Sequence, residues 1–317
     1  MTKNRAIKLV LFLVGLSLLF ALIYKVGFSE VVRVISGAKL YFAVFGVLVY
    51  LIVIFIRSCK WFLLIRVLGK RINYRRFVPF YLVNSLMGNL TPFKSGEAVT
   101  PFLFKKYLKI PVGQGFSVVI LDRFFELVIF TIILVLAVFY ILNSEIQNAF
   151  ILSVFRWALI ALFLLLALLI TALISRRITL KIARLLRLGF LEEELNVFYN
   201  TLFLFKNKKV YRFIIPLTIV VWFLEISAHY LVFSSVLSVP FINVAVAQII
   251  AAAAIFISFV PGGVGIGEAG MVYVLGLFGY PPVLTASGVI LIRLFLTGTV
   301  LGAGLVGSVF VKRLSYR

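Results

Sequence analysis

Long apolar runs, separated by short polar connectors, constrain this chain more than any other feature. A helix rises about 1.5 Å per residue, so runs of roughly 20 residues cross a hydrocarbon core of about 30 Å. Charged residues make up only 13% of the chain, about half the share that soluble domains carry. The sequence therefore predicts an all-α polytopic integral membrane protein, with about six full spans.

The apolar runs divide the chain into spans and connectors. We expect spans at roughly 6–24, 40–57, 115–142, 153–174, 213–237 and 283–307, with a short loop of mixed charge between the first two. One transmembrane domain, 1–317, would then contain two leading spans (1–76), an interrupted segment with a span (77–142), a span with a basic amphipathic loop (153–211), a lone span (213–237) and a second interrupted segment with a span (244–307). In the last span, Gly298 and Gly302 form a small-xxx-small face, for which close helix packing is expected.

The distribution of basic residues predicts the orientation of these spans. Connectors rich in Lys and Arg lie in the cytoplasm, so we place 57–76, 175–211 and the C-terminal stretch after 311 there, and the uncharged loop 238–243 outside. The protein is expected in the cell (plasma) membrane with both termini cytoplasmic. The net charge of +22 follows from this pattern and from attraction to the anionic inner leaflet, so no nucleic-acid partner is expected.

Two apolar segments, 77–106 and 244–278, contain residues that a membrane helix should avoid. The first is interrupted by NLTPFKSGEAVTP and the second by VPGGVGIGEAG. The flanking charges place both ends of the first segment inside and both ends of the second outside, which predicts two re-entrant helical hairpins. Peptide groups of broken backbone cannot face lipid, so these interruptions should line protein or water.

The two interruptions resemble each other. Both place a proline shortly before Gly-Glu-Ala, and Arg123 follows Glu97 at nearly the same spacing as Arg293 follows Glu268. Because the loop charges orient the two units oppositely, this similarity predicts an inverted-topology repeat. Broken segments at matching places in opposed halves indicate the central site of a transporter.

Half of the ten acidic residues fall inside apolar segments. They are Glu97, Asp122, Glu126, Glu225 and Glu268. A charge at the middle of a bilayer costs roughly 2.5–3.5 kcal/mol and normally faces the bundle interior or a wet cavity. We therefore expect a shared polar cavity, in which Lys94, Arg123 and Arg293 are the available cations. Asp122 and Glu126 share a helix face, so a nearby cation is needed or one carboxylate stays protonated.

Glu225 and His229 also share a helix face, and two interpretations stay open. They form an interhelical hydrogen bond that fixes packing, or they are a protonatable pair that couples a proton to transport; Glu126 is a further candidate for that role. His229 is the only histidine and Cys59 the only cysteine, so we expect no metal site and no disulfide within one chain. No cofactor is expected.

The glycines of the second interruption predict the kind of ligand. The amides around Gly262, Gly263 and Gly265 can form an anion-binding nest, to which a half-helix near Glu268 adds its positive N-terminal end. In the first interruption, Lys94 beside Gly96 supplies a full positive charge. The expected ligand is therefore an anionic or zwitterionic head group, with phosphate as the first choice.

Three stretches carry a resemblance to a known family. MGNLTPFKSGEAVTPFLFKK, VVILDRFFEL and ISFVPGGVGIGEAG, in this order, resemble the lysylphosphatidylglycerol synthase transmembrane family, which includes the flippase portion of the multiple peptide resistance factor. The resemblance implies a lipid-flippase-like domain. It points to Pro92, Gly96, Glu97, Asp122, Arg123, Pro261, Gly262, Gly263, Gly265 and Glu268 as site residues.

This sequence also departs from the family pattern. Lys94 and Thr100 stand where relatives often carry arginine, and Gly267 replaces a bulkier or basic residue, which leaves the identity of the lipid open. The soluble aminoacyl-transferase domain of fused relatives has no counterpart in this sequence, so lipid synthesis by this chain is not expected.

Three functions remain open at this point. The first is a lipid flippase or flippase-like transporter for an anionic or zwitterionic lipid of phospholipid or polyprenyl-phosphate type. The second is an integral membrane transferase that acts on a lipid-linked substrate, with buried carboxylates as general bases. The third is a non-catalytic partner that recruits a lipid-synthesising enzyme through its basic loops.

Overall fold

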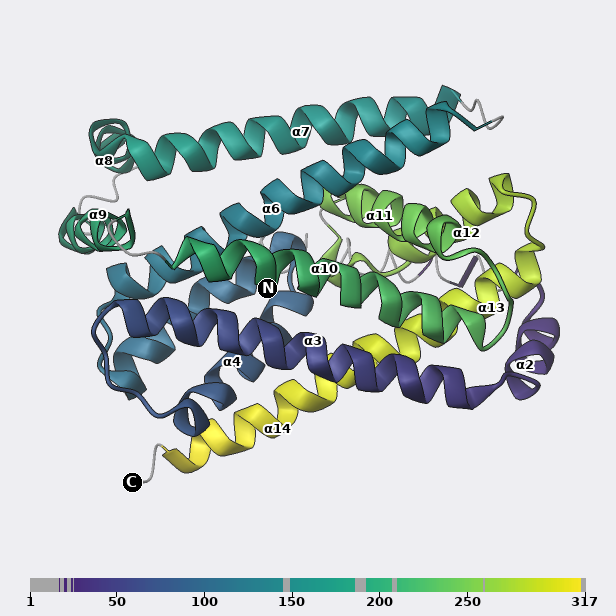
Figure 1. Cartoon of the computed structure of the whole chain (residues 1–317), viewed down its shortest axis with the longest axis horizontal. Helices are drawn as coiled ribbons and strands as arrows, with labels where there is room; N and C mark the ends of the chain where they lie inside the picture. The colour runs from purple at the N-terminus through teal and green to yellow at the C-terminus, as the bar shows by residue number, and fades with distance from the viewer. Residues whose placement is uncertain are drawn as a thin grey trace.

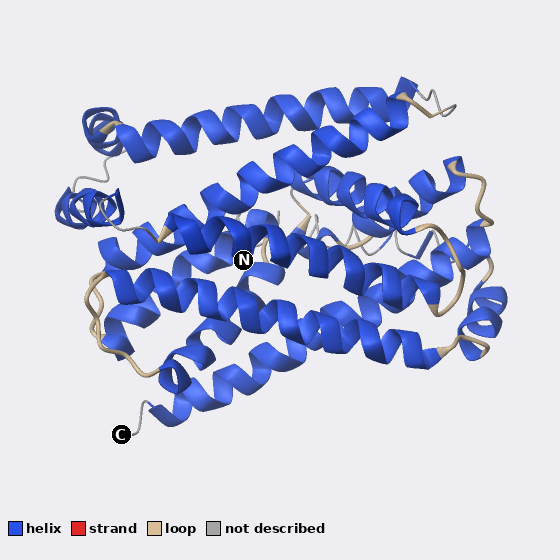
Figure 2. Ribbon diagram, in the orientation of Figure 1, coloured by secondary structure: helices blue, strands red, loops and turns tan. Residues whose placement is uncertain are grey.

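Helices make up all the regular structure in the part of the chain that the structure describes (Figure 2). This computed structural model describes residues 26–144, 149–185, 192–206, 210–258 and 260–314, together with Ser17, Phe20, Ala21 and Tyr24. The predicted first span, 6–24, therefore lies almost wholly outside the described residues. Within them, the predicted all-α class is confirmed.

Four helical stretches are long and apolar enough, by length and composition, to cross a membrane. They are α3 (Leu40–Val67), α6 (Val112–Leu142), α10 (Tyr211–Ser234) and Pro282–Arg313, which combines α13 (Pro282–Ile292), the π-helical turn η5 (Arg293–Thr297) and most of α14 (Gly298–Leu314). A further helix, α7 (Ala149–Ile174), contains the shorter apolar stretch Arg156–Thr171. Figure 1 shows α3, α6, α7 and α10 running along the long axis of the molecule.

The two interrupted segments are broken where the sequence predicts. The first consists of α4 (Tyr74–Asn89), the 3-10 helix η1 (Pro92–Val99), α5 (Thr100–Leu103) and the π-helix η2 (Phe104–Leu108). The second consists of α11 (Phe241–Ser258), the 3-10 turn η4 (Pro261–Gly263) and α12 (Ile266–Leu277). Gly262 and Gly263 have φ angles of 63° and 61°, which glycine adopts without steric cost. η1 contacts η4, so the two breaks meet inside the molecule.

The two ends of the molecule differ in their elements. Figure 1 places α8 (Arg176–Leu185), α9 (Glu192–Lys206), the connector after α3 and the end of α14 at one end. α2 (Phe28–Ser36) and the connectors after α10 and α12 lie at the other. α8 confirms the predicted helix in the basic loop as far as Leu185, and the residues predicted to continue it lie outside the described part. The connector predicted as a loop of mixed charge instead contains the helix α2.

The second predicted span ends too early at residue 57. α3 continues to Val67 because Trp61 and the aliphatic residues after it keep the helix apolar, and Gly69, with a φ of 76°, follows its end. Arg57 and Lys60 therefore lie inside the helix and not in a polar connector, which corrects their predicted placement. Lys60 is 0% exposed.

Close helix packing in the last span uses different glycines from the predicted pair. A β-carbon added at Gly298 or Gly302 would meet nothing within 4 Å in the described structure. At Gly304 it would lie 2.3 Å from Cβ of Leu86, and at Gly307 it would lie 2.7 Å from Cβ of Leu82. Among the described residues, the predicted Gly298/Gly302 face meets no neighbour, and the face that packs on α4 carries the other two glycines.

This difference gives a matched pair of substitutions. Gly304→Ala is expected to lower the unfolding free energy by about 1–3 kcal/mol, because the new methyl group overpacks the contact with α4. Gly302→Ala is expected to raise it by about 0.5–1 kcal/mol, because alanine is the better helix former and meets no neighbour. Thermal unfolding of the two purified variants in detergent checks this, and equal midpoints would contradict the packing described.

Candidate functional site

Glu126 on α6 is the centre of a buried network of ion pairs. Its Oε2 lies 2.9 Å from Nη1 of Arg123, one turn earlier on the same helix. Its Oε1 lies 3.3 Å from Nζ of Lys60 and 3.5 Å from Nε of Arg57, both on α3. One carboxylate therefore contacts three cations and ties α6 to α3.

Asp122 and Lys60 form the most deeply buried pair of this network. Nζ of Lys60 lies 2.8 Å from Oδ1 of Asp122, and the two side chains are 0% and 1% exposed. The Asp122 oxygens accept no hydrogen bond of good geometry, so the contact is one of charge. Nζ also lies 3.4 Å from Oγ1 of Thr218 on α10. The predicted shared face of Asp122 and Glu126 is confirmed, and the cation that it needs is Lys60.

Glu97, in the Gly-Glu-Ala motif of η1, pairs with Arg123. Nε and Nη2 of Arg123 lie 2.8 Å and 2.9 Å from the two carboxylate oxygens of Glu97, which is 4% exposed. Only the Nη2 contact has the geometry of a hydrogen bond. Gly88 leaves room for this carboxylate, since a β-carbon there would lie 2.8 Å from it. Arg123 thus connects the first broken segment to the network on α6.

Gly96 allows η1 to lie close against α4. Its N–H donates to Oγ1 of Thr91 at 2.6 Å, and an added β-carbon would lie 2.3 Å from the carbonyl oxygen of Met87. The backbone cannot shift easily at that distance. Gly96 therefore holds the position of Glu97 in the site.

Glu268, in the Gly-Glu-Ala motif of the second broken segment, is also paired with an arginine. One oxygen accepts a hydrogen bond of 2.7 Å from the Gly265 N–H, and the other forms an ion pair with Nε of Arg293. Nη1 of Arg293 also donates to the Gly262 carbonyl at 3.0 Å. In both interruptions, then, the Gly-Glu-Ala glutamate pairs with the arginine that follows at matching spacing.

The predicted glycine nest has internal partners for two of its amides. The Gly265 N–H binds the Glu268 carboxylate, and the Gly263 N–H donates to the Val260 carbonyl at 3.0 Å. The N-terminal end of α12 thus holds an anion, as expected of such a site, but the anion belongs to the protein itself. A ligand phosphate at this position has to compete with Glu268.

Glu225 and His229 do not form the side-chain pair that their spacing suggested. Oε2 of Glu225 accepts a hydrogen bond of 2.7 Å from Nη2 of Arg57. Nδ1 of His229 lies 2.8 Å from the backbone carbonyl oxygen of Glu225. The helix that carries both residues, α10, contacts α3, which carries Arg57, and η5, which carries Arg293.

Lys94 is the cation that the network leaves without a direct partner. It forms no hydrogen bond or salt bridge with the residues that the structure describes, although it lies near Arg123 and Glu97. Its φ angle of 54° is unusual for a residue with a side chain. Lys94 was predicted to neutralise the buried carboxylates, and Arg57 and Lys60 do so instead.

Sequence reasoning missed these two cations because basic residues near a span end usually lie in the cytoplasm. A signal was present. Arg57 and Lys60 lie one helical turn apart, and the apolar residues that follow them continue the run.

Four carboxylates pair with three cations around α6, and Lys94 lies next to this network. The members are Glu97, Asp122, Glu126 and Glu225, with Arg57, Lys60 and Arg123.

The carboxylates of the site are matched with arginine and lysine side chains and are not grouped as metal ligands. Among the described residues, no group of three or more His, Cys, Asp and Glu side chains could hold a metal ion. Such pairing reduces the cost of burying charges, but each charge then depends on its partner, because a buried charge left alone is strongly destabilising. The arrangement is suited to exchanging one ionic partner for another, such as a charged head group.

Several long apolar helices around a buried ionic network define a multi-pass membrane protein. The family model for the lysylphosphatidylglycerol synthase TM region matches residues 5–304, and the chain belongs to this family. A UPF0104 membrane protein of Methanocaldococcus jannaschii is 24% identical over 325 residues, which cover 96% of this chain and 95% of the relative.

Two further relatives have similar coverage. A UPF0104 membrane protein of Methanothermobacter thermautotrophicus is 25% identical over 90% of both chains. One of Pyrococcus horikoshii is 25% identical over 94% of this chain and 96% of the relative. No solved structure matches the chain.

Proposed function

We propose that this protein is a lipid flippase or flippase-like transporter, which moves an anionic or zwitterionic lipid of phospholipid or polyprenyl-phosphate type between leaflets. One observation carries the proposal. The two broken segments contact each other, and each holds a buried glutamate paired with an arginine of the next long helix. Broken backbone cannot face lipid and charges are costly there, so their coincidence favours a polar path for a head group.

The proposed topology has six spans and two re-entrant hairpins in an inverted repeat. In support, α6 starts beside α9 at the basic end, where the Gly113 N–H donates to Glu194 at 2.7 Å. α11 and α13 start near the opposite end, after uncharged connectors. The positive-inside rule then puts the basic end and both termini in the cytoplasm, and we place the protein in the plasma membrane.

The head group is proposed to bind between η1 and η4. Lys94 has a charge that no described residue pairs with directly, so it is the natural contact for a phosphate. The carboxylate-rich network beside it suits the amine of a zwitterionic head group. A phosphate that reached Arg293 and the Gly265 N–H would displace Glu268, and such an exchange of partners would link binding to movement of α12.

Proton coupling is a further part of the proposal. Glu225 and His229 are on α10, which contacts both α3 and η5, and Glu126 contacts three cations. A proton taken up at one of these groups would change the balance of charge around the ion pairs of both broken segments. These three residues are therefore the proposed coupling groups.

Lipid relocation in liposomes tests the function. The full chain is reconstituted with a trace of phospholipid that carries a fluorophore on one acyl chain, and a membrane-impermeant reductant bleaches the outer leaflet. We expect bleaching beyond the outer-leaflet share only in the presence of the protein. Lys94→Gln should slow relocation about tenfold, the effect of losing one charge-assisted contact, while Lys39→Gln, at an exposed position, should leave it unchanged.

The same vesicles separate transport from the enzymatic alternative. If the protein is a transferase, a radiolabelled lipid is converted to a new species, which thin-layer chromatography resolves. Conversion without relocation would contradict the transport proposal.

A further inference from the structure

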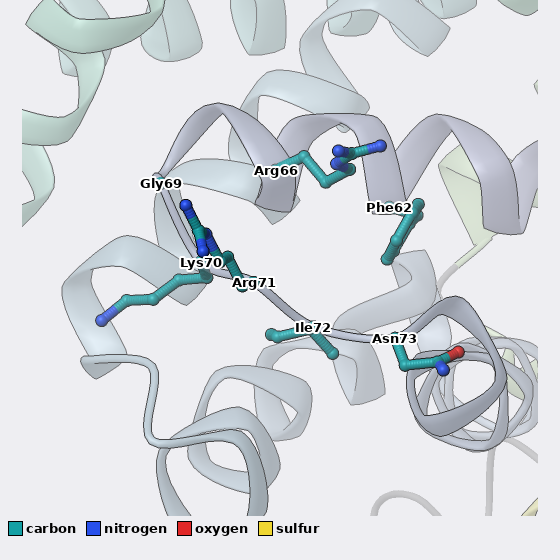
Figure 3. A pocket seen from close by; sticks show the side chains of 7 residues that line it. All are labelled: Phe62, Arg66, Gly69, Lys70, Arg71, Ile72 and Asn73. Atoms are coloured by element: carbon teal, nitrogen blue, oxygen red, sulfur yellow. The ribbon is translucent and has the colours of Figure 1, made fainter.

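A pocket of about 620 Å³ lies at the basic end of the molecule, apart from the ionic network. Phe62 and Arg66 line it from the last turns of α3. Lys70, Arg71 and Asn73 line it from the loop that leads to α4 (Figure 3), and Gly69 and Ile72 complete the wall. The positive φ angle of Gly69 turns the chain, so that the loop runs back past the end of α3. Figure 3 shows the Arg71 side chain reaching back toward the end of α3, whereas the Lys70 side chain extends away from Arg66. Arg66 and Arg71 therefore line the hollow, and Lys70 lies at its rim.

The charges that line this pocket are all positive. No acidic residue is among the seven lining residues. Arg66, Lys70 and Arg71 form no salt bridge with the residues that the structure describes. These cations contrast with Arg57 and Lys60 on the same helix, which have carboxylate partners. The pocket is thus suited to an anion from outside the chain.

The pocket also has an apolar wall. The guanidinium of Arg66 lies 5.9 Å from the ring centre of Phe62, within the range of a cation–π contact. Ile72 faces the same hollow from the loop. Cations beside an aromatic and an aliphatic side chain match a ligand with a phosphate and an adjoining apolar part. A small hydrophilic anion would make no apolar contact with Phe62 and Ile72.

The position along α3 agrees with a lipid ligand. A helix of 28 residues is about 42 Å long, close to the thickness of about 40–45 Å that a bilayer has with its head groups. Arg66 is in the last turn of this helix, which a span of this length places at the level of the head groups. Nine residues separate it from Arg57, which is about 13 Å along the axis, so the pocket is distinct from the network.

We propose that this pocket binds the phosphate head group of an anionic phospholipid from the leaflet at the basic end. Arg66 and Arg71 contact the phosphate, with Lys70 adding positive charge at the rim. Asn73 offers its side-chain amide as a donor, and Phe62 and Ile72 pack against the glycerol and the first acyl carbons. The site lies outside the proposed transport path. A lipid held there would connect the end of α3 with the start of α4, and so with the first broken segment.

Native mass spectrometry of the full chain tests the proposal. The protein in detergent is titrated with phosphatidylglycerol or phosphatidylcholine, and each bound lipid is counted by its mass. We expect one phosphatidylglycerol molecule to bind more tightly than phosphatidylcholine. Arg66→Gln/Arg71→Gln should raise the Kd for phosphatidylglycerol tenfold or more, about the loss for one charge-assisted contact. Lys70→Gln alone should raise it by a smaller factor.

The control is Lys312→Gln/Arg313→Gln. It removes two exposed charges at the same end, and Arg313 lies 5.8 Å from the ring centre of Phe310, as Arg66 does near Phe62. We expect less than a twofold change in this variant. Equal losses in both double variants, or equal binding of the two lipids by the wild type, would overturn the site. If soluble glycerol phosphate displaces the lipid at comparable concentration, the pocket binds a soluble phosphate, and the proposal of a lipid ligand is overturned.

Discussion

Lys60→Met is expected to lower the unfolding free energy by about 3–5 kcal/mol, the cost of breaking a buried ion pair by removing one partner. The ammonium group of Lys60 is inaccessible and lies 2.8 Å from Asp122. Methionine fills a similar volume but cannot balance that charge. Asp122 would then keep only Arg123, at 3.5 Å. Thermal unfolding in detergent and the yield of folded protein measure the loss.

Two matched variants show whether charge is the cause. Arg66→Met also replaces one positive charge by methionine on the same helix, but at an exposed position, and should stay within about 0.5 kcal/mol of the wild type. Lys60→Met/Asp122→Leu removes both charges and should recover most of the lost stability, because an apolar pair of similar volume replaces a buried ion pair at little cost. If Lys60→Met unfolds at the same temperature as Arg66→Met, the ion pair has no structural role.

Glu268→Gln is expected to reduce lipid relocation to the level of protein-free liposomes while the protein stays folded. Glutamine keeps the shape and can still accept a hydrogen bond from the Gly265 N–H, but it cannot neutralise Arg293. The arginine would then lose its charge partner beside the broken backbone. Loss of a charge-assisted contact corresponds to at least about tenfold in rate. The fluorescent-lipid assay measures the initial rate in vesicles that hold equal amounts of protein.

Glu97→Gln is the equivalent change in the first broken segment and should have the same effect, because Glu97 also pairs with one arginine of the next helix. Glu30→Gln is the control, since Glu30 is paired with Arg33 on the exposed face of α2. It should relocate lipid at the rate of the wild type. Normal relocation by Glu268→Gln would remove the central support of the transport proposal.

The network offers a physical route between the two broken segments. Arg123 contacts Glu97 on η1 and Glu126 on α6, and Glu126 contacts Arg57, which binds Glu225 on α10. α10 in turn contacts η5, which carries Arg293. A shift of η1 would therefore change the partners on α10, and a chain of packed ionic contacts of this kind is able to carry coupling.

The sequence by itself determined which segments are helical and where they break. Long apolar runs form helices because only then are all backbone groups satisfied without water. Pro92 and Gly262 mark the breaks, since proline lacks an N–H and glycine accepts a positive φ angle. The sequence also showed the matching spacing of glutamate and arginine in both interruptions, although it did not pair them. These features depend on neighbours along the chain, which a single sequence contains.

Only the tertiary structure decided which helices meet and which charges pair between them. Helical periodicity put Asp122 and Glu126 on one face, but the cation opposite depends on how α3 packs, and that cation is Lys60. Packing also directs Glu225 to Arg57 and brings Gly304 against α4. The physical reason is common to all three: periodicity specifies the direction of a side chain on its own helix, whereas its partner is set by the position of another helix.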